Sequence, residues 1–512
     1  MRKRFDLNVK NCIFLLSIVI LLLFVGYKMK SDSVCCMGVP VVLEQELQKM
    51  MIQSVELDNI VMHGDYQTPY DIAGRKIYLS CSVDETTKYY ELEGQLRSAL
   101  PEYDLYFLWE EGFENLQESI RWGCKFTLYA IDNLGNYSSY YVIFTTLPVL
   151  EMHGECTGID ERERELYYGE MTFWEPKTEK NNRLPVQTSA IEWHVRGYSS
   201  MSFLKKSLRL SLKEKNGEGE NLSLAGLSAD DDYILNPMWF DDVKVREKLA
   251  IDLWNEIAVQ KNSSLKMSGG EYCEVIINGK YEGLRLLQNR IERKYLNLNS
   301  DDMLLKGCNV NPSAGRKLEE AYEIIYSTDE QAAYKAMEGL FTEQNFSNLD
   351  LENWIDTQLL ILLGNMKDNL NYKNIYYVLN ESNGEKRLSM IPWDTDMSFG
   401  VYWIDGSGFQ YAPESVEIIE YRMEYEALKA QYPDLDERMA NRWQELRQTI
   451  FSAENMLGKI DAYRYTVLMS GGVDRDFNML GWYSWGGQDT SEKLKEYIEN
   501  RLLILDEILT VK

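Results

Sequence analysis

The chain has 512 residues, of which 45% are hydrophobic and 26% are charged, so we expect about two to four folded domains rather than disorder. The net charge of −27 argues against a nucleic-acid partner, because such proteins need a basic face. The sequence contains three histidines, His63, His153 and His194. They are far apart, so neither a multi-histidine zinc site nor a histidine-based triad is expected.

The N-terminus carries a targeting signal. A basic stretch, MRKRFDLNVK, precedes the apolar run CIFLLSIVILLLFVGY. We interpret residues 1–30 as a cytoplasmic tail and a signal-anchor helix that crosses the cell membrane once, with the rest of the chain extracytoplasmic. A cleaved signal peptide, which would give a secreted protein, is the alternative. Residues 31–54 are predicted to form a stalk.

The next segment, residues 55–147, is predicted to be a small β-sandwich. Short runs rich in β-branched and aromatic residues alternate with turn signals, as in KIYLSCSV, YDLYFLW, KFTLYAID and YYVIFTTL. The tetrapeptide DNLG predicts a turn between the last two runs. Cys81 and Cys124 fall in this module, and the sequence leaves open whether they form a disulfide.

The remaining residues, 148–512, are predicted to form a β-rich lobe (about 148–312) followed by a helical lobe (about 313–512). A helix is expected over about Val243–Ala258, and Asn278-Gly279 predicts a tight hairpin. Beyond residue 315 the pattern is helical, interrupted by one hairpin at 375–392. The predicted fold class is therefore α+β.

Two basic stretches of the β-rich lobe are candidates for binding an anion. As a strand, LKKSLRLSL (Leu204–Leu212) would place Lys206 on an otherwise apolar face, where an ammonium group needs an anionic partner. The alternative is a lysine whose charged end reaches solvent at the sheet edge. Upstream, the turn RGYSS (Arg196–Ser200) has backbone N–H groups and hydroxyls that are suited to phosphate oxygens.

A set of acids and an amide surrounds the predicted hairpin at 375–392. Asp350 is a candidate N-cap of a helix that ends near Gly364, and a loop with Asp368 and Asn374 follows. Antiparallel pairing would bring Asn374 close to Asp394, ten residues on either side of Gly384. Carboxylate and amide oxygens suit Mg²⁺, and a loop base, an Asn, a hairpin and a metal-binding Asp are the order found in kinases. The alternative is that Asp394 and Asp396 only cap a turn.

These stretches resemble the spore coat protein H (CotH) kinase family, an atypical branch of the protein-kinase-like fold. The matching segments, in the family's order, are RGYSSMSFLKKSLRL, VREKLAIDLWNEI, NGKYEGLRLL, LGNMKDNLNYKNIYYV and PWDTDMSFG. The resemblance implies phosphorylation of Ser/Thr on surface or coat proteins with ATP and Mg²⁺ (or Mn²⁺). It assigns Asp368 as the catalytic aspartate.

The resemblance also assigns the ligand-binding residues. Lys206 or Lys205 would contact the ATP phosphates, together with the turn residues Arg196, Ser199 and Ser200. Asp394 would be the main metal ligand, Asp396 would support it, and Asn374 would bind metal or order the loop.

Three departures from the family pattern leave a second hypothesis open. Asn289 stands where the family usually has Glu, Tyr198 stands where Asn is usual, and Asp368 and Asn374 are six residues apart, one more than in ordinary kinases. An inactive pseudokinase that serves surface adhesion or envelope assembly is therefore the alternative. A third hypothesis is carbohydrate hydrolysis by the paired carboxylates Asp394 and Asp396.

Overall fold

The structure is a computed structural model that describes residues 35–510 except 84–89, 93, 109–119, 121–125, 156–164, 177–185, 198, 309–317, 371–372, 383–384, 405–407, 412–423 and 481–489. The predicted tail and anchor helix (residues 1–30) lie outside the described residues, as does Cys124, so both predictions stay open. Across the described residues, no helix has the length and hydrophobicity needed to span a membrane.

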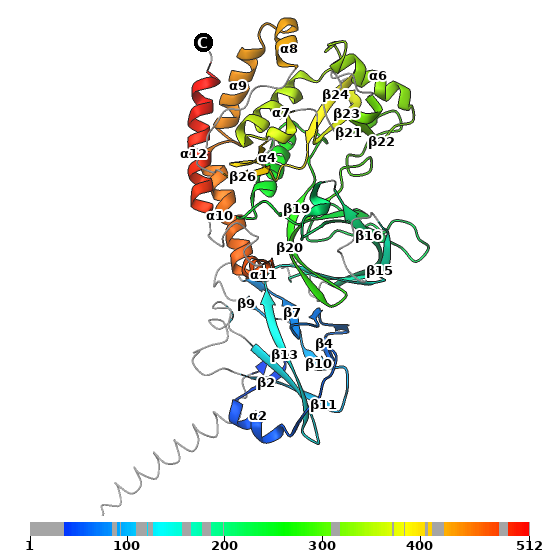
Figure 1. Cartoon of the computed structure of the whole chain (residues 1–512), viewed down its shortest axis with the longest axis vertical. Helices are drawn as coiled ribbons and strands as arrows, with labels where there is room; N and C mark the ends of the chain where they lie inside the picture. The colour runs from blue at the N-terminus through cyan, green and yellow to red at the C-terminus, as the bar shows by residue number, and fades with distance from the viewer. Residues whose placement is uncertain are drawn as a thin grey trace, which may run out of the picture. The chain divides into compact units, whose positions relative to one another are not determined.

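The chain divides into two compact units, one made of Met1–Phe144 with Pro176–Pro185 and the other of Thr145–Glu175 with Val186–Lys512. Strands and helices occur together along the described chain, which confirms the predicted mixed α+β class (Figure 1). Each unit has its own hydrophobic core.

The first unit consists mainly of strands, arranged in sheets of eight, three and two strands. The eight-stranded sheet has the order β1-β2-β11-β12-β13-β7-β6, and β3 pairs with β13. The described elements are β1 (Cys35–Cys36), β2 (Val39–Val42), α2 (Glu44–Met50), β3 (Gln53–Ser54), β4 (Val61–His63), β5 (Tyr66–Gln67), β6 (Tyr70–Asp71), β7 (Lys76–Ser80), β8 (Ser82–Val83), β9 (Tyr90–Glu91), β10 (Leu96–Ser98), β11 (Tyr103–Leu108), β12 (Phe126–Asp132) and β13 (Asn136–Thr145).

The predicted stalk at 31–54 is wrong for residues 35–54. Strand β2 pairs in parallel with β11, through Phe107 opposite Val41, and β3 pairs with β13. Val39 and Leu47 are buried. These apolar side chains complete the sheet and its core, so the segment folds with the unit that follows it.

Both predicted turns form, and each depends on a glycine. After β12, Asp132 Oδ1 accepts from the backbone N–H groups of Leu134 (2.9 Å) and Asn136 (2.8 Å), while Gly135 takes φ +79°. In the second unit, Asn278 (φ +48°) and Gly279 (φ +70°) connect two paired strands. Positive φ at both central residues is the geometry that favours Asn-Gly in two-residue hairpins.

The second unit begins with a closed seven-stranded barrel of order β14-β15-β16-β17-β18-β20-β19. Its strands are β14 (Val149–Gly154), β15 (Tyr167–Trp174), β16 (Val186–Arg196), β17 (Ser207–Lys213), β18 (Asp232–Asn236), β19 (Gly270–Ile277) and β20 (Lys280–Asn289). A short 3-10 helix, η1 (Ser199–Ser202), precedes β17, and α4 (Arg246–Gln260) follows β18. Alternate residues of β17, including Leu208, Leu210 and Leu212, are fully buried in the barrel core, as the period of two predicts.

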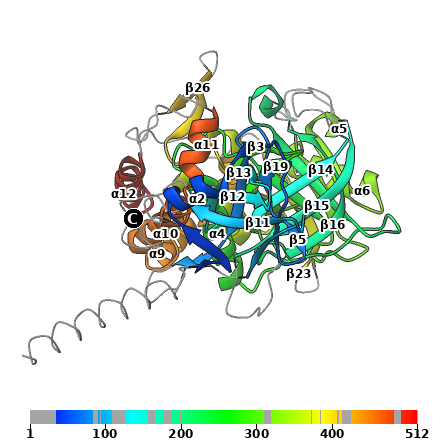
Figure 2. The same cartoon turned by 90° about the horizontal axis from the view of Figure 1, so that it is seen from below.

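The rest of the second unit combines helices with a four-stranded sheet of order β22-β21-β23-β24. The elements are β21 (Met303–Gly307), α5 (Leu318–Ala321), β22 (Tyr322–Tyr326), α6 (Glu330–Phe341), α7 (Leu351–Gly364), η3 (Lys367–Asn369), β23 (Ile375–Ser382), β24 (Glu385–Pro392), β25 (Val401–Ile404), β26 (Gly408–Tyr411), α8 (Tyr425–Gln431), α9 (Leu435–Arg447), α10 (Ala453–Met469), α11 (Gly472–Leu480) and α12 (Ser491–Ile508). Helices α10 and α12 lie side by side in both views (Figures 1 and 2).

This sheet corrects one part of the sequence interpretation. Beyond residue 315 we expected a single hairpin among helices, yet β22 adds a strand, and β21 joins it to the hairpin. Since β21 ends at Gly307, the sheet includes residues on both sides of the predicted lobe boundary at 312/313. Short strands such as β22 are held by their neighbours, so their own sequence predicts them weakly.

The helix that leads to the candidate site begins and ends where the sequence predicts. Asp350 accepts a hydrogen bond from the Asn353 backbone N–H (3.1 Å) and so caps α7. The helix ends at Gly364, and the cap residue Asn365 takes the left-handed conformation (φ +52°). Almost all of α7 is buried, which holds the loop after it in place.

Candidate active site

The base of the hairpin β23–β24 brings the predicted site residues together. Strand pairing places Ile375 opposite Pro392, and the Trp393 backbone N–H donates to the Asn374 carbonyl (2.9 Å). Asn374 and Asp394, just outside the paired strands, both have left-handed backbones, with φ of +56° and +57°. Asn and Asp are the non-glycine residues that adopt this conformation most readily. The spacing argument is therefore correct to within one residue, since Asn374 lies opposite Trp393 and Asp394 follows it.

The loop that follows α7 joins this base through side-chain hydrogen bonds. Asn369 Nδ2 donates to the carbonyls of Asn374 (3.0 Å) and Trp393 (2.8 Å), so one buried amide holds both ends of the hairpin. Asp368 Oδ2 accepts from Asn374 Nδ2 (3.2 Å) and lies 2.9 Å from Lys373 Nζ. Asp368 and Asn374 are thus in direct contact, as expected. The structural role of Asn369 was missed by sequence reasoning.

A further acid, Glu247 at the start of α4, reaches the same site. Its carboxylate accepts from Thr395 Oγ1 (3.0 Å) and from Gln288 Nε2 on β20 (3.2 Å). Thr395 lies between the two predicted metal-binding aspartates, so Glu247 connects the barrel and its helix to the Asp394–Asp396 segment. The sequence offered no signal for this residue, because one Glu in an amphipathic helix looks like ordinary surface charge.

The carboxylates of this site affect one another strongly. Desolvation, followed by the charges of Asp394, Glu247 and Asp368, raises the pKa of Asp396 well above its ordinary value. Among these four, in the part of the chain that the structure describes, Asp368 is the carboxylate that has a cation within 4.0 Å. Carboxylate and amide oxygens are the ligand types that Mg²⁺ and Mn²⁺ take, so the residue types at this site suit such an ion. Among the described residues, however, no three carboxylates of this site have oxygens within 4.8 Å of one another.

The stability of the metal-free protein should depend on pH through Glu247. Burial and then the Asp394 charge raise the pKa of Glu247 from 4.5 to about 7, although hydrogen bonds from Gln288 and Thr395 oppose this. The folded state therefore binds this proton more tightly than the unfolded state, and stability should fall as pH rises from about 4.5 to 7. The difference corresponds to about 3 kcal/mol.

Urea unfolding of the wild type and of Glu247→Gln in EDTA at pH 4.5 and pH 8 measures this effect. The variant lacks the titrating group, so the wild type should lose about 3 kcal/mol relative to it across this pH range. An equal pH dependence of the two proteins would contradict the assigned environment of Glu247.

The two candidate lysines do not lie on a strand. Strand β17 begins at Ser207, one residue after Lys206, and Leu204 is 61% exposed instead of facing the core. The alternation argument therefore fails for Lys206. This lysine is buried, and its Nζ donates to the Met201 carbonyl of η1 (2.8 Å).

Lys205 forms a buried ion pair with Asp476 of α11. The Nζ–Oδ1 distance is 2.5 Å, Nζ also donates to the Leu284 carbonyl, and both side chains are 1% exposed. Lys244 Nζ lies 3.5 Å from the other oxygen of Asp476. Burial lowers the pKa of Lys205 to about 7, although Asp476 opposes this. The anionic partner that a buried lysine needs is thus supplied by the protein itself.

The turn residues contribute one cation near the acids. Gly197 has φ +104°, and a Cβ there would lie 1.9 Å from Ser200 Oγ, so only glycine fits. Ser199 begins η1. Arg196 ends β16 and donates to Ser207 Oγ (3.3 Å). Its guanidinium lies 5.7 Å from the centre of the ring of Trp393, the residue before Asp394.

Lys306 of β21 also lies near the candidate site, and sequence reasoning missed it. Its Nζ lies 5.8 Å from the centre of the Tyr376 ring. Burial lowers the pKa of Lys306, the Arg196 charge lowers it further, and Asp394 opposes both. Lys306 is therefore close enough to Arg196 and Asp394 to respond to the charge of each.

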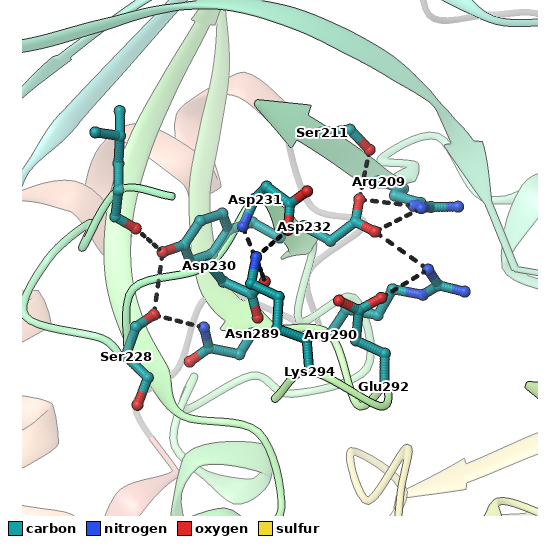
Figure 3. A network of polar contacts seen from close by, with 12 residues as sticks. Arg209, Ser211, Ser228, Asp230, Asp231, Asp232, Asn289, Arg290, Glu292 and Lys294 are labelled. Atoms are coloured by element: carbon teal, nitrogen blue, oxygen red, sulfur yellow. Dashed lines mark hydrogen bonds and ion pairs between the residues drawn. The ribbon is translucent and has the colours of Figure 1, made fainter. Parts of the chain in front are cut away.

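A second group of acids lies at one end of the barrel (Figure 3). Asp230, Asp231 and Glu292 each have a carboxylate oxygen within 4.8 Å of the others. Lys294 points between Asp230 (3.1 Å) and Asp231, with which it also forms an ion pair.

The neighbouring carboxylate of Asp232 is held in the same network. It pairs with Arg209 (2.6 Å) and Arg290 (3.2 Å). The network therefore sets three cations against four carboxylates, and it ties β17 and β18 to the end of β20.

Comparison with protein-family models matches residues 193–505, more than half of the chain, to the family described as CotH kinase protein. The chain belongs to the CotH kinase family. Comparison with curated proteins finds no match. Membership of the CotH kinase family indicates a kinase-like protein. The matched range contains Arg196, both candidate lysines and all the acids of the hairpin base.

Proposed function

We propose that this protein is an atypical kinase that uses Mg-ATP (or Mn-ATP) to phosphorylate Ser/Thr residues of surface or coat proteins. The observation that carries the proposal is the convergence of Asp368, Asn374, Asp394 and Asp396 at the base of one hairpin, within a CotH kinase domain. This is the set of groups that positions a hydroxyl and a metal-bound phosphate in phosphoryl transfer.

The residues would act as follows. Asp394, Asp396 and Asn374 would hold the metal ion, which when bound supplies positive charge for the phosphate oxygens. Asp368 would orient the substrate hydroxyl and accept its proton. Lys373 Nζ and Asn374 Nδ2 both contact Oδ2 of Asp368, which leaves Oδ1 to face the hydroxyl. Asn369 would keep the two sides of the site in register through its two hydrogen bonds.

The site is proposed to act outside the cytoplasm, on a chain tethered to the cell membrane. The support is the basic stretch and the apolar run within residues 1–30. The alternative of a cleaved signal would give the same chemistry in a secreted protein. In either case, the partners would be the nucleotide and a protein of the surface or coat.

A pseudokinase used for adhesion or envelope assembly is the second candidate, and Asn289 is the observation that favours it. This residue stands where the family usually has Glu. Its Nδ2 donates to the Ser228 carbonyl (2.9 Å), and its Oδ1 is buried without a hydrogen-bond partner. An uncharged amide there supplies no anion for a lysine or a metal ion.

Nucleotide binding and phosphoryl transfer by the purified full-length protein test the proposal. The wild type should show an Mg²⁺-dependent thermal shift with ATP and should label a protein substrate or itself. Asp394→Asn should lower labelling by at least about 100-fold, because one charge-stabilising ligand is lost. Asp301→Asn, on an exposed residue before β21, is the matched control. A wild type without thermal shift or labelling would instead support the pseudokinase.

A further inference from the structure

Two cations lie above two neighbouring aromatic rings at the edge of the candidate site. The guanidinium of Arg196 is 5.7 Å from the centre of the Trp393 ring, and Lys306 Nζ is 5.8 Å from the centre of the Tyr376 ring. The two rings contact each other edge to face, with centres 5.8 Å apart. The rings thus bring together cations from β16 and β21, two elements that are far apart in the sequence.

Both cations lack a close anion. Over the described residues, no carboxylate oxygen lies within 4.0 Å of either Arg196 or Lys306, whereas Lys205 and Lys294 each have one. Both side chains are half-buried, so water compensates their charges only in part. Each also repels the other, since the Arg196 charge disfavours a proton on Lys306. Two partly desolvated cations at one site are stabilised when an anion binds to both of them.

The position of the two cations indicates which anion would bind them. Lys306 is opposite Tyr376 in the pairing of β21 with β23, and the next residue, Gly307, accepts from the Asn374 backbone N–H (3.2 Å). Lys306 is therefore at the end of the sheet where the hairpin base lies. Arg196 precedes the sharp turn at Gly197, on the barrel side of the site. An anion between them would lie next to Asp394, the proposed metal ligand.

We infer that Arg196 and Lys306 form the phosphate-binding subsite, and that Lys306 supplies the amine assigned at first to Lys205 or Lys206. The inference rests on the proposed function, because it takes the anion to be the phosphates of the bound nucleotide. Lys205 is committed to Asp476 and Lys206 to the Met201 carbonyl, whereas Lys306 has no such ion pair among the described residues and lies on β21 beside the hairpin base. A guanidinium and an ammonium on opposite sides of the site suit a triphosphate, which offers oxygens in several directions.

Isothermal titration of the full-length protein with Mg-ATP, adenosine and tripolyphosphate tests this assignment. Lys306→Met should weaken the binding of ATP and tripolyphosphate by about 10- to 100-fold, the range for one lost charged hydrogen bond, and leave adenosine unchanged. Lys306→Arg keeps the charge and should retain most of the affinity, even if the methionine variant folds poorly. Lys335→Met, on an exposed lysine of α6, is the matched control.

The outcomes separate this inference from the proposed function. Wild-type affinity of Lys306→Met for ATP, with lost affinity in Lys206→Met, would overturn the assignment while leaving a kinase. Tripolyphosphate binding that depends on Lys306, in a protein that transfers no phosphoryl group, would support the subsite and reject the kinase. A wild type that binds neither tripolyphosphate nor ATP would reject both.

Discussion

Replacing Asp368 with alanine should lower the rate of phosphoryl transfer by about two to four orders of magnitude and leave Mg-ATP affinity almost unchanged. The reason is its position in the loop between α7 and the hairpin, where it accepts from Asn374 and pairs with Lys373. A carboxylate held there can take a proton from a hydroxyl. Single-turnover labelling with radioactive ATP, together with titration of Mg-ATP binding, gives both quantities.

Two further variants test whether the loss of rate is specific to the Asp368 carboxylate. Asp368→Asn keeps the size and an acceptor oxygen but cannot accept the proton, so it should be about as slow as the alanine variant. Asp301→Ala removes an exposed aspartate next to the same sheet and should react at the wild-type rate. Labelling by Asp368→Ala as fast as by the wild type would show that another group accepts the proton.

Replacing Lys205 with methionine should destabilise the second unit by about 3–5 kcal/mol, the usual effect of leaving one member of a buried ion pair without its partner. Asp476 is 1% exposed in the structure. Burial acts to raise the pKa of Asp476, but the charges of Lys205 and Lys244 hold this pKa below its ordinary value. Without Lys205, this carboxylate keeps only the more distant Lys244. Urea unfolding at pH 6, below the Lys205 pKa of about 7, measures the loss.

Additional substitutions separate this structural role from nucleotide binding. Adding both Asp476→Leu and Lys244→Met to Lys205→Met should recover most of the lost stability, because apolar side chains then replace all three buried charges. Lys335→Met, which is exposed, should change stability by less than about 0.5 kcal/mol. If Lys205→Met unfolds like the wild type but binds ATP weakly, Lys205 is the phosphate ligand of the initial prediction.

Local patterns in the sequence predicted several features of the fold and site correctly. The cap at Asp350, the helix end at Gly364 and the Asn278-Gly279 turn each depend on residues that are close together in the chain. The hairpin at 375–392 also follows from local spacing, and its pairing places Asn374 near Asp394. These features are governed by backbone conformation and strand register, which short stretches specify.

The contributions of Glu247, Asn369 and Lys306 could not be predicted in this way. Glu247 reaches the site because α4 packs beside the Thr395 segment, and Lys306 reaches it because β21 pairs with the hairpin. The error at Lys206 has a related cause, since β17 starts three residues later than the strand predicted from Leu204. Whether such side chains reach the site depends on how elements that are distant in the sequence pack against one another.

The sequence alone was enough to indicate the family, the mixed α+β class and the acids of the hairpin base, because motifs of a few residues carry that information. Which cations face those acids became apparent only from the folded chain. Lys205 precedes a strand of the second unit and Lys306 lies in another, yet α11 brings Asp476 to Lys205, while strand pairing places Lys306 beside the hairpin base. A charge acquires its partner through packing between distant segments, and that packing is a property of the whole fold.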